Sequence, residues 1–328
     1  MRARFCSRYR IVGVLMMALV LGVATLPLQA QTRITYKSAL EGTAYYQMGS
    51  ELARAIRVGS EGDVVLATEE SQGSVQNIQE VMTREGRYVF TAPPALVADA
   101  MAGEGAFAGH AGNGHERFAS IRGLFPVPSL TMHFVMVGDS GTAAIEALEG
   151  KHVLIGRGTF SAGEAARYFQ LFGLDGKVQL ADASITNGPE ALREGLINAF
   201  VTASSFPTPN VIETASLVPI TLVSFTDEQI AQTGAVRQVI PGGTYPGIAH
   251  PVTTTSLPVI AYTTEQMDAD TAYQLTKTFW EQRAALAEQS AWWESVSPEL
   301  LAHMDTLLHP GALRYYDEAG TALPEHVR

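Results

Sequence analysis

The stretch that decides the fold is HVLIGRGTFSAGEAARYFQLFG at residues 152–173. It opens with a short apolar run typical of a buried strand and passes through a glycine-containing loop at residues 156–161. An apolar-periodic segment from Ala162 to Phe172 follows and predicts a helix, with Gly173 well placed as its C-cap residue. A strand, a loop and a helix in this order predict one unit of a parallel or mixed sheet with helices on its faces.

The same order occurs three times earlier in the chain. Residues 33–39, 63–67 and 88–90 predict strands, and each is followed by a loop and a helical pattern. The alternation starts afresh in the second half, which predicts a second lobe over residues 132–251. After it come a β-branched segment and a long amphipathic helix at 268–289, so residues 31–131 plus 252–328 are predicted to form the first lobe.

The N-terminus has the pattern of an export signal. Four arginines and no acid lie in residues 2–10, an apolar run occupies residues 11–28, and Ala30 closes the segment as a small residue. We predict a signal peptide over residues 1–30, cleaved near Ala30, and a periplasmic mature protein. The alternative is an uncleaved membrane anchor, because the run is about long enough to span a bilayer.

Charge and cysteine usage exclude several function classes for the mature chain. The 328 residues contain one cysteine, Cys6, inside the predicted signal peptide, so the mature chain has no disulfide, thiol nucleophile or cysteine-ligated metal. Removal of residues 1–30 leaves 18 basic residues against 33 acids, a formal charge of −15. Such a charge disfavours nucleic acid and anionic membrane surfaces as partners, although a pocket can still hold an anion.

The loops that follow predicted strands are the candidate ligand-binding elements, since ligands in open α/β sheets bind at the carboxyl ends of the strands. In the first loop, residues 40–46, Gly42 lets the backbone approach a ligand closely. Thr43, Tyr45 and Tyr46 supply hydroxyl groups and an aromatic wall. At least one of the two tyrosines is predicted to face the ligand; the alternative is that one belongs to the core.

The second loop spans residues 69–75, and Ser74 stands just before an apolar-periodic run. It is predicted to be a helix N-cap that also contacts the ligand; the alternative is that capping is its whole role.

Glu41, in the first loop, is unfavourable for an anionic ligand and is better suited to meet an amino group. Phe206, after the strand predicted at 199–201, is a candidate wall of the cleft.

The third loop reads GRGTFSAGE and follows the strand that opened this section. Ser161 has the Ser-x-x-Glu spacing of a capping box. Arg157 is a candidate for a bidentate pair with a carboxylate; the alternative is a solvated surface arginine. Thr159 and Ala162 are predicted to contact the ligand beside Ser161.

Signals for catalysis are weak. TFSAG at residues 159–163 is one glycine short of a nucleophile elbow, and the sequence contains no P-loop, HExxH or complete dinucleotide fingerprint. His110 and His115 lie in a glycine-rich loop and are weak candidates for a metal. We predict no enzyme activity, no catalytic residue, no metal and no cofactor.

Several short elements, taken together and in order, resemble the TAXI-type solute-binding proteins of tripartite ATP-independent periplasmic (TRAP) transporters. They are Gly42-Thr43-Ala44-Tyr45-Tyr46, Gly73-Ser74-Val75-Gln76-Asn77, Asp139-Ser140-Gly141, Leu148-Glu149-Gly150-Lys151, Gly243-Thr244-Tyr245-Pro246-Gly247 and His309-Pro310-Gly311-Ala312-Leu313-Arg314-Tyr315-Tyr316.

The resemblance implies a two-lobed periplasmic-binding-protein clamshell of type II-like architecture, each lobe a mostly parallel sheet flanked by helices. It also implies capture of a small carboxylate, glutamate-like or 2-oxoglutarate-like, and delivery to TRAP membrane subunits.

The chain departs from the family pattern at Gly42-Thr43-Ala44, at Ser161-Ala162-Gly163 and at residues 91–94, where hydroxyls give way to Pro and Ala. Two alternatives stay open: a periplasmic sensor for a receptor kinase, and an exported enzyme on the same scaffold.

Overall fold

The computed structural model describes residues 31–109, 113–139 and 141–328. The predicted signal peptide, His110 and Ser140 lie outside these ranges. His115 lies in a described helix whose first side chains, including its own, are not described. Within the described ranges, no helix combines the length and the apolar character needed to cross a membrane.

Among the described residues, eleven strands form one mixed sheet. Its main path runs β2 (Val64–Glu69), β1 (Thr32–Lys37), β3 (Tyr88–Ala92), β11 (Val252–Thr264), β4 (Ile121–Val137), β8 (Ala199–Ser204), β6 (His152–Leu154), β7 (Gln179–Ala181). Off this path, β10 (Val236–Ile240) pairs with β11, and β9 (Ile220–Val223) pairs with β4 and with β5 (Gly141–Ala143).

The sheet is parallel at its two ends and antiparallel in its middle. The pairs β1–β2, β1–β3, β6–β7 and β6–β8 are parallel, as the strand–helix alternation predicts. The two long strands, β4 and β11, pair with each other antiparallel. β4 pairs with β11 from Ile121 to Thr131 and with β8 from Thr131 to Met136, so this single strand joins the two parallel regions.

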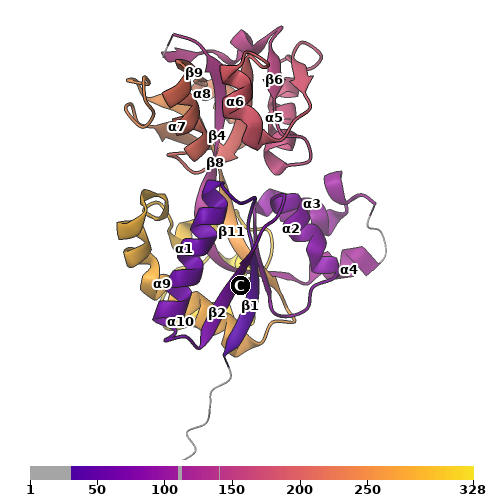
Figure 1. Ribbon diagram of the computed structural model, residues 1–328. Helices are drawn as coiled ribbons and strands as arrows, with labels where there is room; N and C mark the ends of the chain where they lie inside the picture. Colours follow the sequence, from indigo (N-terminus) through magenta and orange to yellow (C-terminus); the bar gives the residue numbers. More distant parts are fainter. Residues whose placement is uncertain (1–30, 110–112, 140) are drawn as a thin grey trace, which may run out of the picture. The chain divides into compact units, whose positions relative to one another are not determined.

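Helices follow most of the strands along the chain (Figure 1). They are α1 (Ala44–Gly59), α2 (Ser74–Gln79), α3 (Pro94–Ala102), α4 (Asn113–Ala119), α5 (Phe160–Leu171), α6 (Gly188–Arg193), α7 (Pro209–Leu217), α8 (Asp227–Thr233), α9 (Ala269–Gln289) and α10 (Pro310–Glu318), with short 3₁₀ turns at Glu80–Met82, Gly105–Phe107, Ile145–Leu148, Ile185–Asn187, Ala291–Trp293, Pro298–His303 and Glu325–Val327.

Helix α1 shows why these elements form. Met48, Leu52 and Ile56 repeat every four residues and are all buried, so one stripe of the helix packs on the sheet. Thr43 caps its first turn, with its side-chain oxygen accepting from the backbone N–H of Tyr46. The predicted long helix is also present as α9, and Asp268 is its N-cap.

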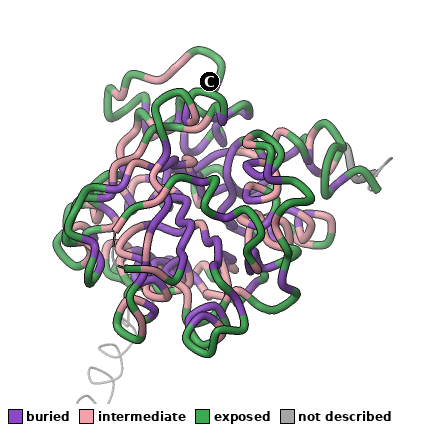
Figure 2. The backbone as a smooth tube through the Cα atoms, turned by 90° about the horizontal axis from the view of Figure 1, so that it is seen from above, coloured by how far each residue is buried: buried purple, intermediate pink, exposed green. Residues whose placement is uncertain are grey.

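The apolar core divides between two lobes. One cluster draws its fully buried residues from positions 34–130 and 259–327, which we call the first lobe. Two further clusters draw theirs from positions 132–252, the second lobe. Ala203 and Leu257 pack against both sides, where the long strands pass between the lobes. Figure 2 shows the buried residues as an interior set and the exposed ones along outer turns.

The structure confirms the predicted two-lobed α/β class. Two local expectations were wrong. Gly73, with φ 109°, is the N-cap of α2, and Ser74 is the first helical residue. The predicted capping box at Ser161 does not form, because α5 begins earlier and Thr159 caps it. Glu164 instead forms an ion pair with Arg167 at 2.7 Å.

Candidate ligand-binding cleft

A cleft of about 320 Å³ lies where the two lobes meet. It is lined by residues 38–45, 72–74, 91, 130, 159–161, 185–186, 202–204, 208–210 and 213. These are strand ends and the first turns of helices, which is where α/β folds place their ligand sites. The volume is at the lower end of the range of small-molecule pockets, roughly 300–1,000 Å³, so it suits a small metabolite.

The first-lobe wall is built by the loop before α1. Gly42 has φ 83°, a left-handed conformation that favours glycine. The Thr43 hydroxyl donates to the Leu40 carbonyl at 2.6 Å, which holds the turn closed. The Tyr45 hydroxyl donates to the carbonyl of Pro128 on β4, so this tyrosine ties the loop to the joining strand. Burial raises the pKa of Tyr45 far above its ordinary value, which keeps this hydroxyl a donor.

The second-lobe wall is built by the loop before α5. The Thr159 hydroxyl donates to the Gly156 carbonyl at 2.8 Å and accepts from the Ala162 N–H at 3.2 Å. The Ser161 hydroxyl lies 2.9 Å from the same oxygen, and because the Thr159 proton is already used, Ser161 is the donor. Gly156 has φ 67°, and a Cβ there would stand 2.9 Å from the Cβ of Ile185.

Helix α7 is held at the cleft by a chain of buried polar groups. The N–H of its N-cap residue, Thr208, donates to the Tyr245 hydroxyl at 3.0 Å. That hydroxyl lies 2.8 Å from His133 Nε2, and His133 Nδ1 lies 2.9 Å from the Thr131 carbonyl. Since a carbonyl only accepts, Nδ1 carries the proton and Tyr245 donates to Nε2. Burial lowers the pKa of His133 to about 4 and raises that of Tyr245 to about 12, so both are neutral at pH 7.

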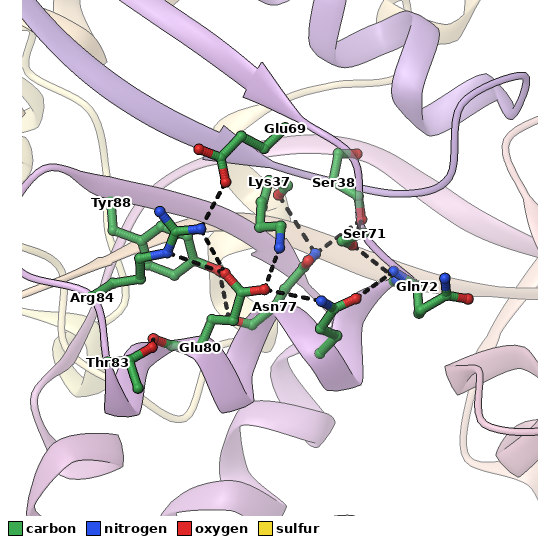
Figure 3. A network of polar contacts seen from close by, with 12 residues as sticks. Lys37, Ser38, Glu69, Ser71, Gln72, Asn77, Glu80, Thr83, Arg84 and Tyr88 are labelled. Carbon is green, nitrogen blue, oxygen red and sulfur yellow. Dashed lines mark hydrogen bonds and ion pairs between the residues drawn. The ribbon is translucent and has the colours of Figure 1, made fainter.

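Behind the first-lobe wall, one amide side chain joins three segments (Figure 3). Asn77 of α2 is fully buried, and its Nδ2 donates to the carbonyls of Ser38 at 2.9 Å and Thr91 at 3.0 Å. β1 and β3 are paired up to the residues just before these two, so the amide bridges the strands where their ladder ends. The Ser71 hydroxyl also donates to the Ser38 carbonyl, at 3.3 Å, which ties in the second loop.

Four charged side chains lie beside Asn77 (Figure 3). Lys37 pairs with Glu80, and Arg84 lies 3.0 Å from Glu80 and 2.7 Å from Glu69. The Lys37 side chain is only 6% exposed, so its charge depends on this partner. Burial alone would raise the pKa of Glu80, but hydrogen bonds and charges from Lys37 and Arg84 outweigh it and hold the pKa below its ordinary value.

The cleft itself carries little formal charge. Among the described residues that line it, Glu41 and Glu213 are charged, and none is Lys, Arg or His. Both carboxylates belong to exposed residues. The remaining polar groups of the lining are hydroxyls, amides and the backbone, which are dipoles without a formal charge.

Five of the nine predicted ligand-binding residues line the cleft: Thr43, Tyr45, Ser74, Thr159 and Ser161. They come from all three predicted loops, which the fold brings to one place. Contact of these residues with a ligand stays a prediction.

The other four predicted residues are not among those that line the cleft. Tyr46 follows Tyr45 on α1 and is rotated about 100° around the helix. Arg157 is exposed at the loop tip, and Ala162 is 6% exposed inside the core of the second lobe. Phe206 precedes Pro207 through a cis peptide bond and packs on the second-lobe cluster beside α7.

Sequence reasoning missed part of the wall: Thr91, Phe160, Thr202, Ser204 and Thr208 also line the cleft. Thr202 and Ser204 point to the same face of β8, two residues apart. The predicted strand ended at Val201, and extending it to Ser204 would have placed both residues on one face of the strand. Phe160 of the second lobe packs against the first-lobe core, and only the tertiary structure decides this contact.

Two elements quoted for the family resemblance support the scaffold. Tyr245 is 1% exposed and holds the start of α7, as described above. His309 caps α10 by accepting from the Gly311 N–H at 3.2 Å, and its Nε2 donates to the Met267 carbonyl at 3.1 Å. A Cβ on Gly311 would stand 2.1 Å from the Ala269 carbonyl oxygen, so glycine is required where α10 meets α9.

Comparison with known proteins places this fold. The chain is similar to the periplasmic binding protein BugD at 10% identity, with 88% of this chain and 98% of that chain covered and a TM-score of 0.56. It is also similar to a protein from Bordetella bronchiseptica RB50 at 12% identity, with 89% and 99% covered and a TM-score of 0.51. The fold is therefore that of a two-lobed periplasmic binding protein. Because the sequence model of the NMT1-like family matches residues 38–320, the chain belongs to the NMT1-like family.

Proposed function

We propose that this protein is a periplasmic solute-binding protein that captures a small carboxylate in the cleft between its lobes. The solute is of the size of glutamate or 2-oxoglutarate, as the TAXI resemblance implies. The observation that carries the proposal is a single cleft whose walls come from strand ends and helix starts of both lobes. Closing two such walls around a solute is how a two-lobed binding protein sequesters it from water.

The proposed contacts are the cleft residues Thr43, Tyr45, Ser74, Thr159 and Ser161. Their elements are positioned by groups that a ligand need not touch, namely Asn77, Tyr245 and His133. A wall positioned in advance by packing and hydrogen bonds lowers the ordering cost of binding.

The proposal extends to the organisation of the chain and its partner. Residues 1–30 are an export signal, residues 31–131 plus 252–328 form the first lobe, and residues 132–251 form the second. The TRAP membrane subunits are the partner that receives the solute. The family match supports this proposal at the level of the fold and leaves the choice of transporter to experiment.

Thermal unfolding of residues 31–328 in the presence of dicarboxylates, 2-oxo acids, amino acids and sugars tests the function. A solute at a hundredfold its dissociation constant adds about 2.7 kcal/mol to the free energy of unfolding. We expect such a shift from one carboxylate class, without consumption of the compound. Turnover of the compound would argue for the enzyme alternative, and a response to sugars alone would contradict carboxylate capture.

A pair of matched variants shows whether the cleft is the site. Ser74→Trp places a bulky ring at the first turn of α2, in the cleft wall. Ser216→Trp places the same ring on the exposed part of α7, outside the residues that line the cleft. We expect the first variant to lose the ligand-induced shift and the second to keep it. An equal ligand-induced shift in the two variants would show that the solute binds outside this cleft.

A further inference from the structure

Helices α1 and α5 both present unpaired backbone donors to the cleft. Thr43 and Thr159 each take one N–H of the first turn. In the described part of the chain, the remaining N–H groups of Ala44, Tyr45, Phe160 and Ser161 have no hydrogen-bond partner. All four residues line the cleft, and the two helix starts come from different lobes. First-turn N–H groups carry partial positive charge and bind anions.

Buried polar groups of side chains in the same cleft, hydroxyls and one amide, point independently to a ligand. Thr91, Thr202 and Ser204 are 2%, 7% and 8% exposed, and each lines the cleft. Asn210 also lines the cleft, and its side-chain Oδ1 is buried without a hydrogen-bond partner in the described part of the chain, whereas buried polar groups are normally hydrogen-bonded. The Asn210 oxygen can accept from an uncharged N–H or O–H group of a solute, and the three hydroxyls can both donate to and accept from such groups.

The charges around the cleft limit how much negative charge a solute can carry. The two charged lining residues, Glu41 and Glu213, are both acidic. The buried cation described above, Lys37, is not among the lining residues and forms an ion pair with Glu80. One anionic group can be held by the helix N–H donors, but a second would lose its hydration without meeting a cation and would face like charge.

From these observations we infer that the cleft selects a carboxylate with a single negative charge, whose remaining polar groups are uncharged amides or hydroxyls. The anionic group lies between the first turns of α1 and α5, and the uncharged groups meet Thr91, Thr202 and Ser204. This inference rests on the proposed function and narrows it, because a dicarboxylate of the same length is then a weaker ligand than its monoamide.

Calorimetric titration with charge-matched pairs tests the inference. The probes are glutarate against its monoamide, and 2-oxoglutarate against 2-oxoglutaramate, which differ by one amide for one carboxylate. We expect the monoamide of at least one pair to bind about tenfold or more tighter than its diacid. Tighter binding of the diacids would overturn the inference and leave carboxylate capture standing. Binding of neither member of either pair would overturn the preference for a monoamide of this length, and the absence of a response to every carboxylate of the thermal-unfolding panel would overturn carboxylate capture as well.

Variants at the two acidic residues give a second readout. Glu213→Gln and Glu41→Gln remove the like charge, so we expect the preference for the monoamide to fall by about threefold or more in each. Glu228→Gln, on α8 and outside the lining residues, is the matched control and keeps the wild-type ratio. An unchanged ratio in both cleft variants would refute the role of these carboxylates.

Discussion

The cleft and the ion-pair network beside α2 differ in the kind of polar group that they contain. The network joins Lys37, Glu80, Arg84 and Glu69, formal charges that satisfy one another beside α2. The cleft is lined by Ser38 and Thr91, at the ends of the strands that Asn77 bridges. Besides the exposed carboxylates of Glu41 and Glu213, its described lining offers hydroxyls, amides and backbone donors without a basic side chain. Paired charges therefore serve the scaffold, and most of the polar groups that line the cleft are uncharged dipoles.

This difference predicts how each region responds to the loss of a polar side chain. A buried charge that loses its partner cannot recover its hydration, so the network is sensitive to the loss of any one member. A dipole that loses its partner costs far less, because helix starts and hydroxyls also bond water when the cleft is open. The network should therefore respond to mutation in stability, and the cleft should respond in affinity.

Removing the central acid of the network is the largest expected effect. Glu80→Gln leaves Lys37, whose side chain is 6% exposed, without its counter-charge. We expect the free energy of unfolding to fall by about 3 kcal/mol, measured by urea denaturation. Glu69→Gln is the control: its side chain is 42% exposed, so a loss of less than about 1 kcal/mol is expected. Similar losses of unfolding free energy in the two variants would show that burial of the ion pair does not determine how much its loss destabilises the protein.

Acid should weaken the protein through His133, which is neutral in the fold. Burial lowers its pKa to about 4, whereas an unfolded histidine titrates near about 6.5. Between these values the unfolded chain binds the proton and the folded chain does not. The stability due to His133 is therefore complete above pH 6.5 and falls by about 3 kcal/mol as the pH drops to 4.

Urea denaturation of the wild type and of His133→Gln between pH 7.5 and 4.5 measures this contribution. The variant should lose most of the slope between pH 6.5 and 4.5, since glutamine does not titrate. His309, whose pKa burial also lowers, is present in both proteins and cancels in the comparison. Parallel curves for the two proteins would mean that His133 is not the titrating group.

Asn77 lies between the two regions, and its loss should affect both. Asn77→Leu removes the donors to the carbonyls of Ser38 and Thr91, two cleft residues, and should cost about 2 kcal/mol of stability. We expect faster amide hydrogen exchange in residues 38–46, 71–79 and 89–95, measured by mass spectrometry. The control, Thr276→Val, removes the bond from a buried hydroxyl to the Ala272 carbonyl in α9 and should leave those segments unchanged.

The smallest expected effect separates a capping role from a ligand role. Thr159→Ala and Thr226→Ala both remove a threonine N-cap, of α5 and α8 respectively, and each should cost about 1 kcal/mol of stability. Thr159 lines the cleft and Thr226 does not. Calorimetric titration should therefore show weaker solute binding for the α5 variant alone. Equal affinity in both would assign Thr159 a purely structural role.

Much of the scaffold was predictable because it depends on local pattern. Met48, Leu52 and Ile56 repeat with helical spacing, and all three are buried in α1, which is one of the helical patterns that the sequence predicts after a strand. The loop positions were predictable for the same reason, since each follows an apolar strand. Which side of a loop faces the cleft was harder: Tyr45 lines it and Tyr46 does not, although the two are adjacent.

The sequence by itself determined the two-lobed α/β order, the long C-terminal helix and the three loops, because periodicity and turn residues act over a few neighbours. Only the tertiary structure decided that Thr91 and Ser204 line the same cleft as Ser74, and that Asn77 supports the first-lobe wall from behind. It also decided that Lys37 is neutralised inside the scaffold and unavailable to the cleft. These outcomes depend on strand pairing between residues far apart in the chain, which no local pattern encodes.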